Sequence, residues 1–333
     1  MSTRVFFTLI GALLLLSTNG VRASADGLPA AAWQQPARYR FEYRVDLPKL
    51  DAAKRVRVWI PHPAETRDQH VISADIDAPW QHKQTRDVLN NQFIYLEGSG
   101  VAEKPLIATY VVERRPSTGV VKADVKPGSS QDPNLYRHAD QLVPLDGLIQ
   151  QIAKQESAGL STEPEKVRAF YNYVVKSMRY NKDGTGWGRG DAIWACTNKR
   201  GNCTDFHSLF IGMSRSQGIP ARFHIGFPIP RDSASGAIAG YHCWAEYFDA
   251  DRGWVPVDAS EANKSGLTDA YFGTLPNDRI QFTTGRDLRL DPPQDGAPLN
   301  YFIYPYVEAD GTVVKDVPAS FRFERITETT AQR

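Results

Sequence analysis

Cys203 is the residue of this sequence with the best position for nucleophilic chemistry. Gly201 predicts a tight turn directly before it, and a helix follows, because apolar residues recur at the spacing of one helix face. Those residues are Phe206, Leu209, Phe210 and Met213. We expect the helix to end near Gly218, with Pro220 just beyond it. A cysteine in the first helical turn feels the positive end of the helix dipole, which favours the thiolate.

This stretch alone is equally compatible with a half-buried structural cysteine. A nucleophile also needs a base and a group that orients the base, and His242 and Asp258 are the candidates. A hairpin with the odd loop 249–251 would oppose them directly, with Cβ atoms ~5 Å apart, so that an imidazole N–H could reach the carboxylate. The same register opposes Glu246 and Trp254. An even loop would turn Asp258 to the other face.

The spacing of the other candidate ligands completes no metal or cofactor site. Cys203 and His207 share a helix face and could form half of a zinc site, but no further pair of ligands stands at a similar short spacing. We interpret His207 as a supporting or packing residue, and His224, within an apolar strand, as a core residue. Asp249 and Asp251 are too few acids for a calcium site. The sequence also lacks phosphate-loop, dinucleotide and EF-hand patterns, so no cofactor and no metal are expected.

The elements that must hold these residues follow one another along residues 146–262. Helical spacing begins after Asp146, and a clearer helix follows Thr162, which can form a capping box with Glu165. A glycine-rich loop at 184–190 carries Trp187 just upstream of Cys203. It suits a rim or lid, although an ordinary solvent loop also explains it. Strands are expected after the cysteine helix, at 221–227, 241–248 and 253–258.

An antiparallel β module is expected before this region, at residues 37–115. Its first strand alternates apolar with charged residues, the pattern of a half-buried strand; the apolar ones are Tyr39, Phe41, Tyr43 and Val45. Further strands are expected at 56–60, 92–96 and 106–113. Residues 116–145 are interpreted as a linker, and residues 263–333 as a C-terminal β extension with a hairpin around Asp310-Gly311. Helices followed by antiparallel strands indicate an α+β fold.

Residues 1–25 have the pattern of an export signal peptide. Arg4 precedes an apolar run at 5–16, and residues 23–25 are small enough for cleavage. The run is too short to span a bilayer and no cysteine follows it for lipidation, so no stable membrane anchor is expected. Without Arg4 and Arg22, the 39 basic residues of the 333-residue chain become 37, against 38 acidic ones. This balance argues against nucleic-acid binding, and we expect a periplasmic or secreted protein.

Three cysteines remain after this processing: Cys196, Cys203 and Cys243. An odd count in an oxidising compartment suggests one disulfide and one free thiol. A Cys196–Cys243 pair would leave Cys203 free for catalysis, but the sequence leaves the connectivity open. Because Cys243 follows His242 directly, it should point to the opposite face of a strand, away from the catalytic side, which favours a structural role.

Three separated blocks together resemble the transglutaminase-like superfamily. They are Gly201–Phe206 with the following Gly218–Arg222, then Tyr241–Glu246, then Gly253–Asp258. The resemblance covers about residues 146–262 and implies a papain-like core, in which a helix-borne cysteine packs on an antiparallel sheet. It also implies that Cys203 is the nucleophile, His242 the general base and acid, and Asp258 the orienting carboxylate. Some transglutaminases depend on calcium, which nothing in this sequence suggests.

These roles predict acyl transfer on amide bonds through a thioester on Cys203. Water as acceptor would make the protein a peptidase or amidase, and an amine would make it transamidating, on protein or peptide substrates of the cell envelope. Backbone N–H groups near Cys203 are expected to hold the oxyanion, with Trp187 and Trp194 as weak candidates for a second donor. The alternative is a non-enzymatic module of this fold that binds a peptide in its groove.

Overall fold

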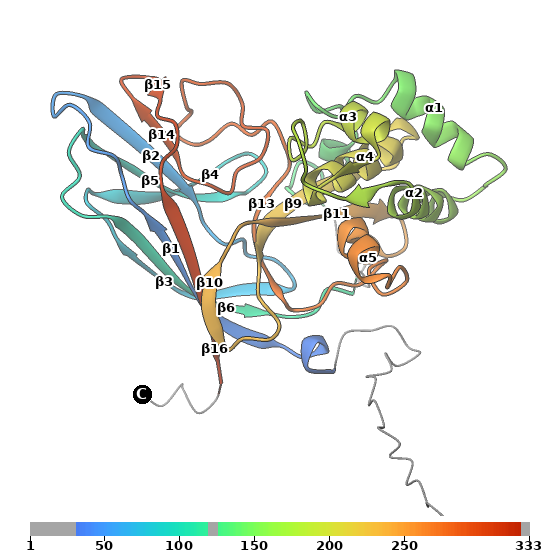
Figure 1. Cartoon of the computed structure of the whole chain (residues 1–333), viewed down its shortest axis with the longest axis horizontal. Helices are drawn as coiled ribbons and strands as arrows, with labels where there is room; N and C mark the ends of the chain where they lie inside the picture. The colour runs from blue at the N-terminus through green and yellow to red at the C-terminus, as the bar shows by residue number, and fades with distance from the viewer. Residues whose placement is uncertain (1–30, 119–125, 328–333) are drawn as a thin grey trace, which may run out of the picture.

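The computed structural model describes residues 31–118 and 126–327 of the chain. The expected signal peptide, residues 1–25, and part of the expected linker lie outside these ranges. Within them, five α-helices gather at one end of the molecule, and mostly antiparallel sheets make up the rest (Figure 1). The predicted α+β class is therefore confirmed.

A four-stranded antiparallel sheet carries most of the elements expected around the site. Its strands are, in spatial order, β12 (Gly253–Val257), β11 (His242–Asp249), β9 (Ala221–Pro228) and β13 (Arg279–Thr284). Three of them were expected, and β13 has no counterpart among the predicted strands. Helix α4 (Cys203–Ser216) packs against β11, and its residues from Cys203 to Arg215 are all buried. A helix buried this fully can hold its first residue rigidly.

The other helices surround α4 and bury it. They are α1 (Gly147–Glu156), α2 (Glu163–Ser177), α3 (Ala192–Asn198) and α5 (Ala259–Ser265). The first two begin where the sequence predicts. The capping box at the start of α2 is present, since Glu165 N–H donates to Thr162 Oγ1 at 3.4 Å and Thr162 N–H donates to Glu165 Oε2 at 3.0 Å. Short helices such as α3 and α5 show too few turns for a periodic pattern.

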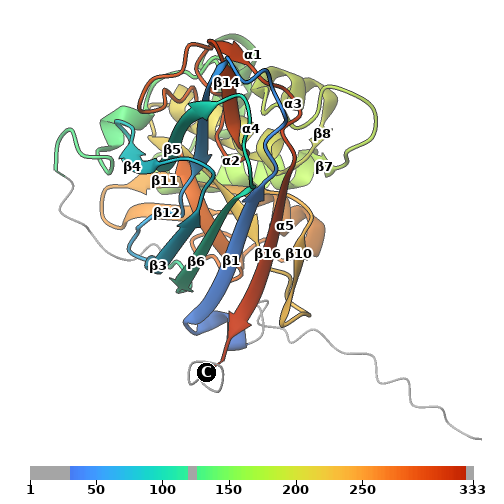
Figure 2. The same cartoon turned by 90° about the vertical axis from the view of Figure 1, so that its left-hand side faces the viewer.

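Two five-stranded antiparallel sheets form the other half of the molecule, and residues from both contribute to one core. The first contains β10 (Ser235–Ile238), β16 (Ala319–Ile326), β1 (Ala37–Val45), β6 (Leu106–Arg114) and β3 (Gln69–Asp77). The second contains β15 (Thr312–Val313), β14 (Tyr306–Ala309), β2 (Arg55–Pro61), β5 (Gln92–Ser99) and β4 (His82–Arg86). The first sheet faces the viewer in Figure 2.

The alternation predicted for the first strand is confirmed, because the four apolar side chains of β1 are fully buried. Strand β2 is buried on both faces, because every residue after Arg55 is buried. Trp59 is buried in a second cluster on the other face, and Arg57 pairs with the buried Glu308. Strands β3 and β4 were not predicted, because most of their side chains are polar and exposed.

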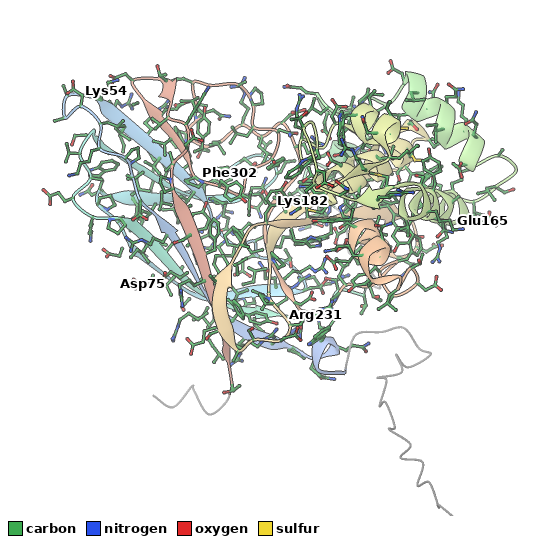
Figure 3. All side chains as sticks on the ribbon, in the orientation of Figure 1. Lys54, Asp75, Glu165, Lys182, Arg231 and Phe302 are labelled. Carbon is green, nitrogen blue, oxygen red and sulfur yellow. The ribbon has the colours of Figure 1, made fainter. Side chains whose placement is uncertain are left out.

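Strands from the two ends of the described chain pair with one another. Strand β1 pairs with β16, and β2 pairs with β14, while β13 joins the sheet of β9 and β11. The residues expected as a C-terminal extension therefore supply strands to three sheets. Figure 3 places Lys54 and Glu165 at opposite ends of the molecule, with side chains filling the space between the sheets and the helices. No described helix has the length and apolar character needed to cross a membrane.

Candidate active site

Cys203 is the first residue of α4, as the sequence predicts, and its side chain is buried. A reciprocal capping box starts the helix: Thr204 N–H donates to Asn202 Oδ1 and Asn202 N–H donates to Asp205 Oδ2, both at 2.9 Å. Gly201 has φ of 148°, and a Cβ there would lie 2.6 Å from Cβ of Asp205. Only glycine fits this close approach, so the turn fixes where the thiol begins.

His242 and Asp258 meet in a direct hydrogen bond. The imidazole Nε2 lies 2.7 Å from Asp258 Oδ2, and both side chains are buried. Asp258 follows β12 and caps α5, because its Oδ1 accepts from Glu261 N–H and from Ser260 Oγ at 2.9 Å. Its Oδ2 also accepts from Arg279 Nη1 at 2.7 Å. Four donors therefore hold this carboxylate in one orientation.

The expected hairpin register is wrong, because the turn is centred on residue 251 and not on residue 250. Asp249 pairs with Gly253 across a three-residue loop, so Glu246 opposes Pro256, and Trp254 opposes Phe248. Asp249 Oδ1 accepts from the N–H groups of Asp251 and Arg252 at 2.9 Å, which stabilises this turn. The loop remains odd, so the side-chain faces are as predicted. Asp258 lies beyond the end of the ladder, and the cap of α5 orients it.

The Cys203 thiol interacts with the His242 imidazole, whose Nδ1 is the nitrogen not engaged by Asp258. Burial raises the pKa of Cys203, but hydrogen bonds from Cys243 and His242 and the charge of His242 outweigh it and hold the pKa well below its ordinary 9.0. Burial lowers the pKa of His242, yet Asp258 and Cys203 raise it to about 10. These opposite shifts describe a thiolate–imidazolium pair at neutral pH.

These shifts predict a broad pH range for the activated thiol. Alkylation of Cys203 by iodoacetamide should stay fast well below pH 9, because the thiolate persists there. Turnover should fall above about pH 10, where His242 loses the proton that it would give to a leaving group. Mass spectrometry of alkylated peptides between pH 5 and 11 measures the first effect. A midpoint for Cys203 near that of an ordinary thiol would contradict the ion pair.

Cys243 lies beside Cys203, so the expectation that it stays away from the catalytic side is wrong. All three cysteines are free thiols in this structure. The Cys243 side chain points toward α4, 3.6 Å from Thr204 Oγ1 and 3.9 Å from His207 Nδ1, and it lies close enough to Cys203 to lower the pKa of that thiol. As alternation along β11 requires, the Cys243 side chain points to the opposite face from His242. The first turn of α4, however, lies on the face to which Cys243 points. Burial and the neighbouring Cys203 raise its pKa well above 9.0, so Cys243 remains a donor.

Replacement of Cys243 by alanine should therefore weaken the Cys203 thiolate. Loss of one hydrogen bond to a charged sulfur should slow alkylation of Cys203 at pH 6 by roughly tenfold. The matched control is Cys196→Ala, because Cys196 lies in α3 and contacts Lys199 rather than the site. Equal alkylation rates in Cys243→Ala and the parent protein would show that Cys243 does not act on the thiolate.

His207 and His224 both have structural partners, as interpreted from the sequence. His207 Nδ1–H donates to Cys203 O at 2.7 Å, and its Nε2 accepts from Ala259 N–H at 3.2 Å, which ties α4 to the start of α5. Burial lowers the pKa of His207, so it is neutral. His224 contacts Glu246 and Thr284, each at 2.9 Å.

One group of possible metal ligands among the described residues overlaps the site. His242, Asp258 and Glu261 bring ligand atoms within 4.8 Å of one another. Each already has another partner: Asp258 holds His242 and Arg279, and Glu261 pairs with Lys264. The two cations supplied by Arg279 and Lys264 disfavour a further positive ion there. The arrangement fits a relay better than a metal centre.

Several residues that sequence reasoning missed position the site. Asp205 accepts from Gly188 N–H at 2.7 Å and Gly190 N–H at 3.0 Å, so it fixes the end of the glycine-rich loop beside α4. Arg279 lies on the unpredicted strand β13. The pattern of Asp258 followed three residues later by Glu261 is a helix-start signal that could have indicated α5.

The Cys203 N–H is the best-placed donor for an oxyanion. Among the residues that the structure describes, no acceptor receives it. The Tyr241 hydroxyl lies next to it along the same turn, 2.9 Å from Asn202 Nδ2 and 3.0 Å from Thr204 Oγ1. Trp187, one of the suggested second donors, uses its indole N–H on Gly184 O at 3.0 Å. A backbone N–H without an acceptor at the start of a helix can donate a hydrogen bond to the negative charge that develops on an oxyanion.

Comparison with known proteins agrees with this geometry. Residues 150–259 match the family model of the core domain of the transglutaminase-like superfamily, and Cys203, His242 and Asp258 all fall in that range. An uncharacterized protein of Haemophilus influenzae is 25% identical over 337 residues, covering 86% of this chain and 90% of the relative. The resemblance seen in the sequence is thus confirmed for the core.

Two solved structures are similar to this chain at low identity. A candidate cysteine protease from Cytophaga hutchinsonii matches with a TM-score of 0.55 and 15% identity, covering 87% of this chain and 98% of that one. The periplasmic domain of TgpA from Pseudomonas aeruginosa matches with a TM-score of 0.37 and 15% identity, covering 71% and 93%. The first likeness supports the fold over most of this chain, and the second is too distant to support more.

Proposed function

We propose that the transglutaminase-like core is a cysteine acyltransferase that acts on amide bonds, with Cys203, His242 and Asp258 as its relay. The observation that carries this proposal is the geometry of His242, which is bound through Nε2 to Asp258 at 2.7 Å and lies close enough to Cys203 to lower the pKa of its thiol. The thiol stands at a helix start beside a free amide, where both a nucleophile and an oxyanion donor are needed.

The residues divide the reaction into two steps. The Cys203 thiolate attacks the carbonyl carbon of an amide, and the N–H of Cys203 donates to the oxyanion. His242 then gives its proton to the leaving nitrogen, which departs as ammonia or an amine, and a thioester remains on the sulfur. In the second step His242 takes a proton from water or an amine as that acceptor attacks the thioester. Asp258 keeps the imidazole oriented throughout and stabilises its charged form.

The acceptor decides between peptidase or amidase action and transamidation. We propose protein or peptide substrates of the cell envelope, in a periplasmic or secreted setting, on the strength of the signal-peptide pattern at residues 1–25. Cys203 is only 2% exposed, so we propose that a substrate approaches it through a narrow opening beside Tyr241, whose hydroxyl contacts Asn202 at the start of α4. Extended peptide chains suit such a narrow approach better than bulky folded surfaces.

Trapping of the acyl-enzyme tests this proposal. The mature protein is incubated with a library of glutamine-containing peptides and a labelled primary amine, and peptides and protein are analysed by mass spectrometry. We expect a transient acyl adduct on Cys203 and either labelled or hydrolysed peptides. Labelled products indicate transamidation, and hydrolysed ones indicate peptidase or amidase action. Peptide binding without any adduct or product would instead favour the non-enzymatic peptide-binding module.

A further inference from the structure

A second cavity lies on the face of the central sheet opposite α4. Alternate residues of β11, Trp244 and Glu246, line it, whereas the intervening positions face the helix, as the contact of Cys243 with Thr204 shows. Its volume is about 510 Å³, within the range of small-molecule sites. The catalytic triad is not among the described residues that line this cavity. The cavity is therefore distinct from the proposed acyl-transfer site, although it adjoins that site through Trp244, whose ring centroid lies 6.3 Å from that of His242.

Arg114, the last residue of β6, brings to this cavity a buried guanidinium that has nearby carboxylates, Asp68 and Glu246, but no direct ion pair among the described residues. Its side chain is 1% exposed, and its Nη2 donates to Ser117 Oγ at 2.9 Å. Its Nε–H is buried and has no acceptor among the described residues. Burial lowers the pKa of Arg114 to about 10, so the guanidinium still carries its charge at neutral pH. Buried cations normally have an anionic partner, because desolvation of an isolated charge is unfavourable.

The acids around the cavity have partners of their own. Glu246 holds both Arg222, at 2.6 Å, and His224, at 2.9 Å. Asp68 lies 3.0 Å from Arg67, and the third lining acid, Glu65, contacts a histidine outside the cavity. None of them forms an ion pair with Arg114 within the described ranges. The described lining therefore holds three arginines and three carboxylates, and Arg114 is the one arginine among them without a direct ion pair, beside two tryptophan rings, Trp244 and Trp254.

We propose that this cavity binds a small organic carboxylate, with its carboxylate on Arg114 and Ser117 and its body against the tryptophan rings. The arginines and carboxylates of the lining are equal in number, so a monoanion adds one negative charge opposite Arg114, whereas a dianion such as sulfate adds two near three acids. Arg114 Nη2 and Ser117 Oγ lie 2.9 Å apart, so the two groups can donate to the two oxygens of one carboxylate. A peptide with a free C-terminus is one member of this ligand class, and its uncharged amide is a matched control.

Binding to the mature Cys203→Ala protein tests the proposal without turnover, so its outcome does not depend on the proposed acyl transfer. Isothermal titration calorimetry compares N-acetyl-L-alanyl-L-alanine, its C-terminal amide and sodium sulfate, with tryptophan fluorescence as a second readout. We expect the carboxylate to bind about tenfold or more tightly than the amide, and more tightly than sulfate. Equal affinity of acid and amide, tighter binding of sulfate, or no binding of the acid would each overturn the proposal.

Arg114→Gln should remove the preference for the acid over the amide. The matched control is Arg115→Gln, since Arg115 is exposed and pairs with Glu113. Should Arg114→Gln not fold, Ser117→Ala provides the milder variant, which should weaken binding of the acid several-fold and leave that of the amide unchanged. A preference that survives in a folded Arg114→Gln protein, or in Ser117→Ala at full strength, would place the carboxylate elsewhere and contradict the assignment.

Discussion

Replacement of Cys203 by alanine is expected to abolish amide cleavage and transfer, lowering kcat/KM by at least about 10³-fold. No other described nucleophile can take its place, because Cys243 is a thiol with a raised pKa and faces Thr204. The fold should be kept, with a change in the free energy of unfolding of about 1 kcal/mol, since one buried atom is lost. Steady-state assays with a substrate from the peptide library, and thermal melting, measure the two effects.

Cys196→Ala is the control for this prediction. Cys196 is as buried as Cys203 but lies in α3, so its loss should leave turnover close to that of the parent protein. Full activity in Cys203→Ala would exclude the thioester route, and absence of turnover in the parent protein would favour the binding module. Loss of activity in both variants would indicate a general effect of removing buried sulfur.

The local parts of the site could be predicted because each depends on neighbours in sequence. A glycine turn, a capping residue and helical spacing place Cys203 at the start of α4, and all three signals lie within residues 201–213. The parity of the hairpin likewise depends only on the number of loop residues. The register of the hairpin depends on more than the number of loop residues, because Asp249 stabilises one particular turn by accepting hydrogen bonds from two backbone N–H groups.

The rest of the site depends on contacts between distant segments, which periodicity does not show. Cys243 turns away from His242 as predicted, yet it meets Cys203 because α4 lies on that side of the sheet. Arg279 reaches Asp258 from β13, a strand whose six residues are all buried and therefore show no alternation.

Replacement of Asp258 by asparagine should affect both catalysis and stability. The side-chain amide of the variant could point its N–H groups at His242 Nε2 and Arg279. In the flipped orientation it would offer them its carbonyl oxygen, which is a weaker acceptor than the carboxylate. His242 would then favour the tautomer that cannot take a proton from Cys203, and we expect kcat/KM to fall roughly 10⁴-fold, as in other relays of this kind. Arg279 would lose its buried anion, which should lower the free energy of unfolding by roughly 3 kcal/mol or more.

The pH dependence separates this effect from a simple loss of packing. Burial raises the pKa of Asp258, but His242 and Arg279 hold it well below its ordinary 3.8. A carboxyl with a lowered pKa stabilises the fold above its ordinary pKa, and this contribution is lost as the pH falls toward the folded value. The stability difference between the parent protein and Asp258→Asn should therefore be largest near pH 7 and shrink below about pH 4. Denaturant unfolding from pH 3 to 8 measures it, with the exposed Asp269→Asn as control. A difference that stays constant over this range would show that the charge of Asp258 does not stabilise the fold.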